Sequence, residues 1–208
     1  MLISYEHKFI FVHIYKTAGT SVEKALMHYC CSQPRLFLNK VLLHLFKGKI
    51  RINPQPYRKH ISAKELALIY PDEIFKEFFK FAFVRNPWDW QVSLYTYTLK
   101  NKNHYQHEMV KKLGSFDSYI RQRAAKKPKN QLDWIQSNDG TMLVDYVGKF
   151  ENLKNDFGSI CNKIGIESTL PKVNVSNGKS YQGFYNEETR SLVETTYKRD
   201  IEYFNYKF

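Results

Sequence analysis

The chain has 208 residues, of which 16% are aromatic, and its formal net charge is +12 at pH 7. This length suits one sizeable domain and is short for two, while the aromatic content excludes a globally disordered chain. No apolar run approaches the roughly 18 residues of a transmembrane segment. The N-terminus lacks the layout of a signal peptide, and the three cysteines form no Cys-x-x-Cys pair. We therefore expect a single cytoplasmic domain over residues 1–208, whose positive charge favours anionic partners.

The first predicted strand is the apolar run Phe9–Ile14, which leads into a short loop, Lys-Thr-Ala-Gly-Thr-Ser, at 16–21. A helix follows at once, and its apolar face contains Val22, Ala25, Leu26 and Tyr29. A helix start beside a lysine and three hydroxyls suits a phosphate-like anion, because the amides and the helix dipole add to the lysine charge. The lysine precedes the glycine, so the loop is not a strict P-loop. An ordinary strand-to-helix turn is the alternative interpretation.

The next segment, 32–60, is rich in lysine, arginine and proline. We expect a short helix around 41–46 and then an irregular basic loop. Helices are predicted at 62–70 and 72–79, and the apolar run 81–84 is expected to form a second strand.

A second motif begins where this strand ends, at Arg85-Asn-Pro87, and the proline suits the first turn of a helix. The face of that helix contains Trp88, Val92, Tyr95 and Leu99. Arg85 offers a planar fork of donors that suits a dianionic phosphate, and Ser93, two turns into the helix, adds a hydroxyl. The alternative is a surface arginine followed by an ordinary helical serine.

The rest of the chain alternates between helices and one further strand. We expect a helical region at 104–125, a strand at 144–147, a helix at 153–164, a polar loop at 167–183 and a last helix at 186–203. Strands that alternate with helices predict an α/β fold with a parallel sheet flanked by helices.

The two motifs together resemble those of the sulfotransferases that use 3′-phosphoadenosine 5′-phosphosulfate (PAPS) as donor. Residues 16–21 resemble the 5′-phosphosulfate loop of these enzymes, and residues 81–93 resemble their 3′-phosphate motif. Residues 147–153 and 185–208 are similar to the carbohydrate-type branch, which includes the heparan 2-O-sulfotransferases and the bacterial sulfotransferase family 2. The match departs at Tyr15, where the family usually has proline.

A second departure is Trp90, which replaces a frequent arginine and so removes one positive charge or one ion pair. Residues 32–59 and 101–130 match the family poorly. The resemblance nevertheless implies a P-loop-like three-layer sandwich with a central, mostly parallel sheet flanked by helices.

The resemblance also implies a donor site. The residues expected to hold the 5′-phosphate are Lys16, Thr17, Ala18, Gly19, Thr20 and Ser21. Arg85 and Ser93 are expected to hold the 3′-phosphate of PAPS and of its product 3′,5′-ADP, and residues 179–181 to lie over the nucleotide. Lys16 is also the expected catalytic group that stabilises the leaving oxygen. No metal is expected, because fixed cations supply the charge.

His60 is the expected general base, because it resembles in context and position the proposed base of the heparan 2-O-sulfotransferases, and histidine is a side chain suited to this role near neutral pH. The alternative is a histidine that precedes a helix capped by Ser62. Glu23, Glu65 and Asp89 are weaker candidates for the base. His13, within the first strand, is expected to be a buried, hydrogen-bonded histidine.

The expected acceptor is a carbohydrate, acidic or neutral, either a glycan or a lipid-linked sugar, with peripheral association with membrane glycan assembly left open. The basic segments 40–59 and 121–129 favour an acidic glycan. Two other functions remain as alternatives. A P-loop-type kinase of a small molecule would need a magnesium-binding carboxylate, for which Asp145 is a poor candidate. A basic nucleic-acid-binding domain fits the charge, but the sequence has no such motif, so no nucleic acid is expected.

Overall fold

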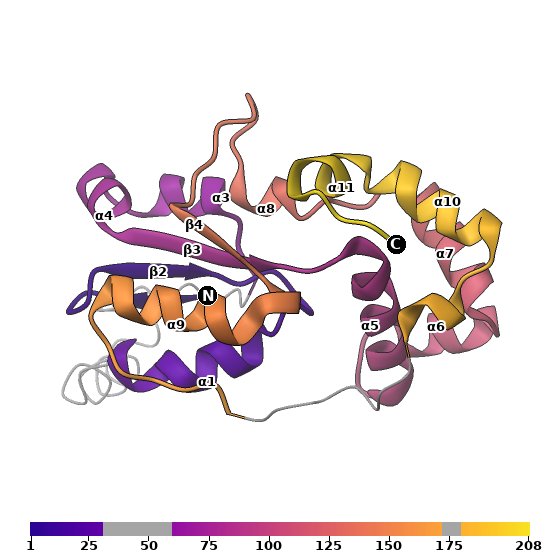
Figure 1. Ribbon diagram of the computed structural model, residues 1–208. Helices are drawn as coiled ribbons and strands as arrows, with labels where there is room; N and C mark the ends of the chain where they lie inside the picture. Colours follow the sequence, from indigo (N-terminus) through magenta and orange to yellow (C-terminus); the bar gives the residue numbers. More distant parts are fainter. Residues whose placement is uncertain (31–59, 172–179) are drawn as a thin grey trace, which may run out of the picture. The chain divides into compact units, whose positions relative to one another are not determined.

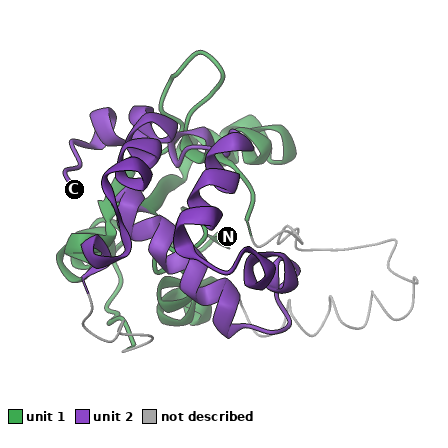
Figure 2. Ribbon diagram, turned by 90° about the vertical axis from the view of Figure 1, so that its right-hand side faces the viewer, with its two compact units in different colours: residues 1–83, 134–173 green, residues 84–133, 174–208 purple. Residues whose placement is uncertain are grey.

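The computed structural model describes residues 1–30, 60–171 and 180–208, so the helix expected around 41–46 and the basic loop after it lie outside the described residues. The chain divides into two compact units, which Figure 2 shows in green and purple. Unit 1 contains residues 1–83 and 134–173, and unit 2 contains residues 84–133 and 174–208.

Unit 1 is built on a four-stranded sheet with the strand order β1-β2-β3-β4. The strands are β1 (Leu2–Ser4), β2 (Phe9–Val12), β3 (Phe79–Val84) and β4 (Tyr146–Lys149). β1 pairs with β2 in antiparallel orientation, and β2 pairs with β3 in parallel, with Phe11 opposite Phe81. The sheet is mostly parallel and flanked by helices, which confirms the predicted α/β class.

Helices cover both faces of this sheet (Figure 1). α1 (Gly19–Cys30) and α9 (Leu153–Ile164) lie on one side, and α3 (Ala63–Ile69) and α4 (Asp72–Glu77) lie on the other. Since side chains alternate along a strand, one set of strand residues faces α1 and α9. That core contains Phe9, Phe11, Phe81, Phe83, Val22, Leu26, Phe157 and Ile160.

Unit 2 is helical. Its helices are α5 (Pro87–Lys100), α6 (His107–Leu113), α7 (Phe116–Ala125), η2 (Tyr181–Phe184), α10 (Glu187–Thr196) and α11 (Lys198–Phe204). Trp90 of α5 is fully buried and packs edge-on against Tyr197, with ring centroids 5.6 Å apart. The short helix α8 (Leu132–Ile135) crosses from unit 2 to unit 1.

Two predicted helices are each divided in the structure. The region 104–125 forms α6 and α7, because Gly114 takes a left-handed φ of 74° and ends the first helix. The last helix, expected over 186–203, is interrupted at Tyr197, which lies between α10 and α11 with φ −112° and ψ 25°. At the second break the side chain of Tyr197 is 1% exposed, so a buried aromatic residue lies where the chain leaves the helical pattern.

The strand predictions also need correction. β1 was not expected from the sequence. β3 begins at Phe79 rather than at residue 81, because the Phe79 amide donates to the carbonyl of Lys8 beside β2. β4 begins at Tyr146, two residues later than expected, and the amide of Asp145 donates instead to the carbonyl of Lys80.

Candidate functional site

The loop between β2 and α1 has a backbone that few side chains favour. Lys16 and Ala18 both have left-handed φ values, 62° and 68°, which cost about 1 kcal/mol or more each in a residue other than glycine. The Ser21 amide donates to the Ala18 carbonyl at 2.9 Å and so starts α1. Left-handed residues on either side of Thr17 can turn neighbouring amides towards one point, an arrangement that suits an anion at the positive end of a helix.

Some side chains of the 16–21 loop are buried and stabilise its conformation, whereas others are accessible to solvent. The Thr17 side chain is fully buried and its hydroxyl donates to the Ile14 carbonyl at 2.8 Å. Because that hydroxyl has a single hydrogen, Thr17 offers an anion its backbone amide rather than its side chain. Thr20 is exposed, Lys16 is partly exposed and Ser21 is 8% exposed. Lys16 and Thr20 are therefore the side chains most accessible to a phosphate.

Gly19 is required because of its neighbour. A Cβ built on Gly19 would lie 1.8 Å from Nε2 and 2.0 Å from Cδ2 of His13. The imidazole of His13 therefore packs directly against the first residue of α1. No side chain fits at position 19 while that ring stays in place.

His60 lies beside this loop, within unit 1. Its Nδ1 is 2.9 Å from the carbonyl oxygen of His13, and the two imidazole centroids are 4.5 Å apart. Since a carbonyl only accepts, Nδ1 carries the hydrogen, and Nε2 of neutral His60 is the nitrogen that can take a proton. Tyr15 and Trp134 flank the His60 ring at 6.0 and 6.4 Å between centroids.

The three alternative bases are each engaged by a structural partner. Glu23 accepts from His13 Nδ1 at 2.8 Å and from the N-terminal ammonium of Met1 at 3.2 Å. Glu65 accepts from the amide and hydroxyl of Ser62, which completes the predicted cap of α3. Asp89 accepts from Arg85. These contacts favour His60 as the base, although His60 also precedes a helix capped by Ser62.

His13 is buried and hydrogen-bonded, which confirms its predicted character. Burial is the main reason that its pKa falls from 6.5 to about 4, against the opposing effect of Glu23. His13 is therefore neutral at pH 7. A folded state that holds this ring neutral binds fewer protons than the unfolded chain between these two pH values.

We expect this histidine to weaken the fold in acid. The free energy of unfolding should fall as the pH drops from 6.5 towards 4, by about 3 kcal/mol at most for His13. Asp200 acts in the opposite sense, because burial raises its pKa to about 6 and the folded state then gains a proton below that pH. The measurement is therefore a comparison of urea unfolding across this range for the wild type and His13→Phe. An equal slope in both proteins would contradict the assignment.

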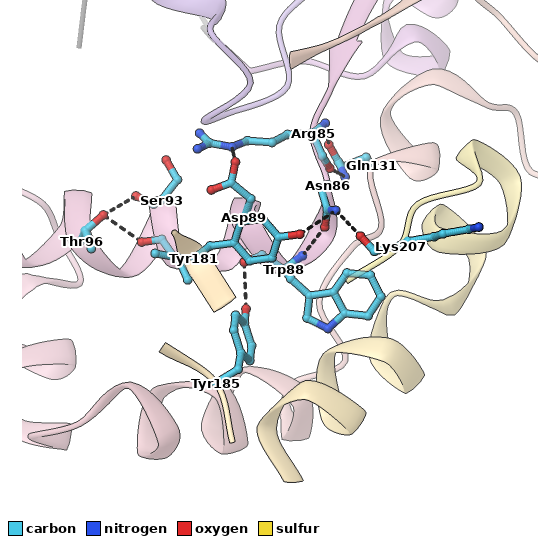
Figure 3. Close-up of polar contacts among 11 residues, drawn as sticks. Arg85, Asn86, Trp88, Asp89, Ser93, Thr96, Gln131, Tyr181, Tyr185 and Lys207 are labelled. Carbon is cyan, nitrogen blue, oxygen red and sulfur yellow. Dashed lines mark hydrogen bonds and ion pairs between the residues drawn. The ribbon is translucent and has the colours of Figure 1, made fainter. Parts of the chain in front are cut away.

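Arg85 directly follows β3 and belongs to unit 2. Its side chain is 9% exposed, and its Nε donates to Oδ2 of Asp89 at 2.7 Å. Figure 3 shows the terminal guanidinium nitrogens directed away from Asp89, on the same side of α5 as the Ser93 hydroxyl in this view. The two residues predicted to hold a phosphate thus come from the end of β3 and from α5.

Sequence reasoning missed the group that fixes the backbone of Arg85. The side-chain amide of Gln131, which is fully buried, accepts from the Arg85 amide and donates to the Arg85 carbonyl, both at 2.8 Å (Figure 3). Asp200 in turn accepts from the amides of Gln131 and Leu132 at 2.7 and 3.0 Å. No local sequence signal marks Gln131, because its partners lie 46 and 69 residues away.

The N-cap of α5 is also held by late residues of the chain. Asn86 Oδ1 accepts from the Trp88 amide at 3.1 Å, and its Nδ2 donates to the Lys207 carbonyl at 2.8 Å and to the Tyr181 hydroxyl at 3.3 Å (Figure 3). The Tyr185 hydroxyl donates to the Trp88 carbonyl at 2.8 Å. The first turn of α5 therefore depends on residues near the C-terminus.

The two departures from the family pattern have structural explanations. Trp90 points into the core of unit 2, so position 90 contributes no charge to a surface site. Tyr15 packs edge-on against Trp134, with centroids 5.7 Å apart, and forms an aromatic wall beside His60. Lys179, expected over the nucleotide, lies outside the described residues, whereas Tyr181 contacts Asn86.

The predicted site residues fall into two sets. Lys16 to Ser21 and His60 belong to unit 1, and Arg85 and Ser93 belong to unit 2. Among residues 1–30, 60–171 and 180–208, no group of three or more His, Cys, Asp or Glu side chains is arranged to hold a metal ion. No helix within these ranges is long and apolar enough to cross a membrane.

A mostly parallel sheet with a left-handed turn before the N-terminus of α1 is typical of α/β proteins that bind phosphate groups at a helix start. A model of the sulfotransferase family matches residues 1–207, and the chain belongs to this family, whose members transfer sulfuryl groups. The chain is also similar to an uncharacterized protein of Archaeoglobus fulgidus, with 29% identity over 118 residues, which are 53% of this chain and 88% of that protein.

Proposed function

We propose that the protein transfers a sulfuryl group from PAPS to a hydroxyl of a carbohydrate acceptor and releases 3′,5′-ADP. The observation that carries the proposal is the left-handed turn at 16–21, whose geometry suits an anion, with His60 beside it. In that turn Lys16 and Ala18 have left-handed φ values. Nδ1 of the neighbouring His60 donates to the His13 carbonyl, which makes Nε2 the nitrogen that can accept a proton. A cationic phosphate site next to a base is what sulfuryl transfer to a hydroxyl needs.

The residues present fit the two phosphate groups of PAPS. The 5′-phosphosulfate would bind the 16–21 loop, where backbone amides at the start of α1 donate and Lys16 supplies the charge. The 3′-phosphate would bind Arg85 and Ser93, since a guanidinium offers a planar fork of donors that suits a phosphate and the serine adds a hydroxyl. Both sites use fixed side chains and amides, so the proposal needs no metal.

In the reaction, Nε2 of His60 takes the proton of the acceptor hydroxyl while that oxygen forms its bond to sulfur. The bond between sulfur and the bridging oxygen breaks, and the electron pair stays on the 5′-phosphate. Lys16 stabilises the negative charge that develops there. By analogy with phosphoryl transfer, positioning and electrostatics supply most of the rate.

The acceptor is proposed to be a glycan or a lipid-linked sugar, acidic or neutral. The net charge of +12 supports an acidic one. Within the basic segment 121–129, Arg121 forms a two-bond ion pair with Glu188, and Lys126 and Lys127 are exposed. These two lysines are the better candidates for contact with an acidic group.

The two alternatives lose support. Asp145, the carboxylate considered for magnesium, accepts from the amide of Lys80 at 2.6 Å and lies 2.9 Å from its Nζ. An ion pair of this kind leaves little reason to recruit a metal. The family match also favours sulfuryl transfer over nucleic-acid binding.

The proposal predicts which nucleotide stabilises the protein. In thermal shift measurements we expect 3′,5′-ADP to raise the melting temperature without magnesium, because ligand binding to the native state adds RT ln(1 + [L]/Kd) to stability. Mg-ATP and an oligonucleotide serve as the comparison ligands. Stabilisation by Mg-ATP alone would support a kinase instead, and transfer of labelled sulfate from PAPS to a panel of glycans and small alcohols would identify the acceptor.

A further inference from the structure

His13 lies where the two parts of the proposed site in unit 1 meet. Its side chain is 3% exposed, and its ring packs on the start of α1, where a Cβ at Gly19 would lie 1.8 Å from Nε2. The carbonyl of the same residue accepts from His60 Nδ1 at 2.9 Å, and the two rings meet edge to face at 4.5 Å. One residue therefore contacts both the anion-binding turn and the proposed base.

The His13 ring is held on its other sides. Nδ1 donates to Oε1 of Glu23 at 2.8 Å, and the ring stacks on Phe11 with centroids 5.5 Å apart. The titratable groups that act on it are Glu23 from α1, the ammonium of Met1, which precedes β1, and His60. Because His13 stays neutral at pH 7, it does not repel the imidazolium that His60 becomes when it accepts a proton.

We propose that His13 is a positioning residue for sulfuryl transfer, whose ring sets the spacing between the 16–21 loop and the imidazole of His60. The inference rests on the proposed function, in which the loop holds the donor and His60 deprotonates the acceptor. His13 itself contacts neither substrate. A ring that fixes this spacing affects turnover more than donor binding, because the reacting atoms must be aligned only during the transfer.

Two variants of His13 separate the effect of its ring from the effect of its hydrogen bond to Glu23. His13→Asn keeps a donor near the place of Nδ1 but removes the ring atoms that lie against Gly19. His13→Phe keeps the ring and loses the donor to Glu23. We expect His13→Asn to lower kcat about 100-fold with a smaller change in the KM for PAPS, and His13→Phe to stay within about 10-fold of the wild type. His28→Ala, at an exposed histidine of α1, is the control.

A double variant tests the contact itself. Gly19→Ala places a methyl group where the His13 ring lies, so it should weaken 3′,5′-ADP binding. Adding His13→Ala removes the ring atoms that this methyl group meets, and binding should recover relative to Gly19→Ala alone. Turnover should remain low in the double variant, because nothing then sets the distance to His60. This pattern is non-additive, as expected for residues in direct contact.

The outcomes separate the two proposals. If His13→Asn keeps wild-type kcat, or if the double variant binds 3′,5′-ADP no better than Gly19→Ala, the positioning role is wrong while the proposed function stands. If the wild type neither binds 3′,5′-ADP nor transfers sulfate, both proposals fall. Urea unfolding of each variant shows whether a loss of kcat follows the folded fraction instead, and His13→Phe remains informative if His13→Asn does not fold.

Discussion

Replacement of His60 with alanine is expected to lower kcat by about 100- to 10,000-fold, which is the usual contribution of a general base. Binding of 3′,5′-ADP should persist, because the groups proposed to hold its phosphates, the 16–21 loop, Arg85 and Ser93, are unchanged in this variant. The measurements are kcat with labelled PAPS and the dissociation constant of 3′,5′-ADP by calorimetry.

The control for this experiment is His28→Ala, which changes an exposed histidine of the same unit. Full activity in His60→Ala would show that another group is the base. An equal loss of nucleotide binding and turnover would instead make His60 a structural residue. The proposal requires that His60→Ala loses turnover and keeps 3′,5′-ADP binding. The decline of kcat/KM at acidic pH, which protonation of the base causes in the wild type, should also be absent in this variant.

Substitution of Lys16 should have the second large effect. Lys16→Ala removes the charge assigned to the leaving oxygen, and we expect kcat to fall by about 100- to 1,000-fold, as for loss of one preorganised stabilising donor. The same change should weaken 3′,5′-ADP binding less, because the loop amides and the start of α1 remain. Turnover and calorimetric binding measured on the same preparations would separate these two effects.

The backbone at this position offers a matched control. Lys16 has a φ of 62°. Glycine adopts this backbone conformation without strain, whereas alanine is strained there in the same way as lysine. Lys16→Gly and Lys16→Ala should therefore lose turnover equally if the charge matters. A much smaller loss in Lys16→Gly would mean that loop geometry, not charge, is the cause. Lys24→Ala, at an exposed lysine of α1, tests for a general effect of net charge.

Elements that are determined by residues close together in the chain could be predicted from the sequence. The turn at 16–21 has its lysine, glycine and hydroxyls within one short run, and α9 has a strong apolar face, so both were predicted. Pro87 and Ser62 marked the starts of α5 and α3, and the structure confirms both. Such features depend on propensity and capping within a few residues.

Features that depend on distant partners were not predictable in the same way. β1 is three residues long and exists because it pairs with β2. The break at Tyr197 follows from packing on Trp90, and the fixation of Asn86 follows from Lys207. Tertiary packing overrides local propensity in each case. The assignment of Lys16, Arg85, Ser93 and His60 to specific steps stays a prediction for the experiments above.

Gln131 has one further consequence. Its side-chain amide accepts a hydrogen bond from the Arg85 N–H and donates one to the Arg85 carbonyl. A neighbouring strand of a sheet would form the same pair of bonds, so this side chain takes the place of a strand beyond the end of β3. Asparagine is one methylene too short to span this gap, and glutamate lacks the hydrogen to give. Substitution of Gln131 would therefore free the Arg85 backbone and so change the direction of its guanidinium, although the Gln131 side chain is itself fully buried.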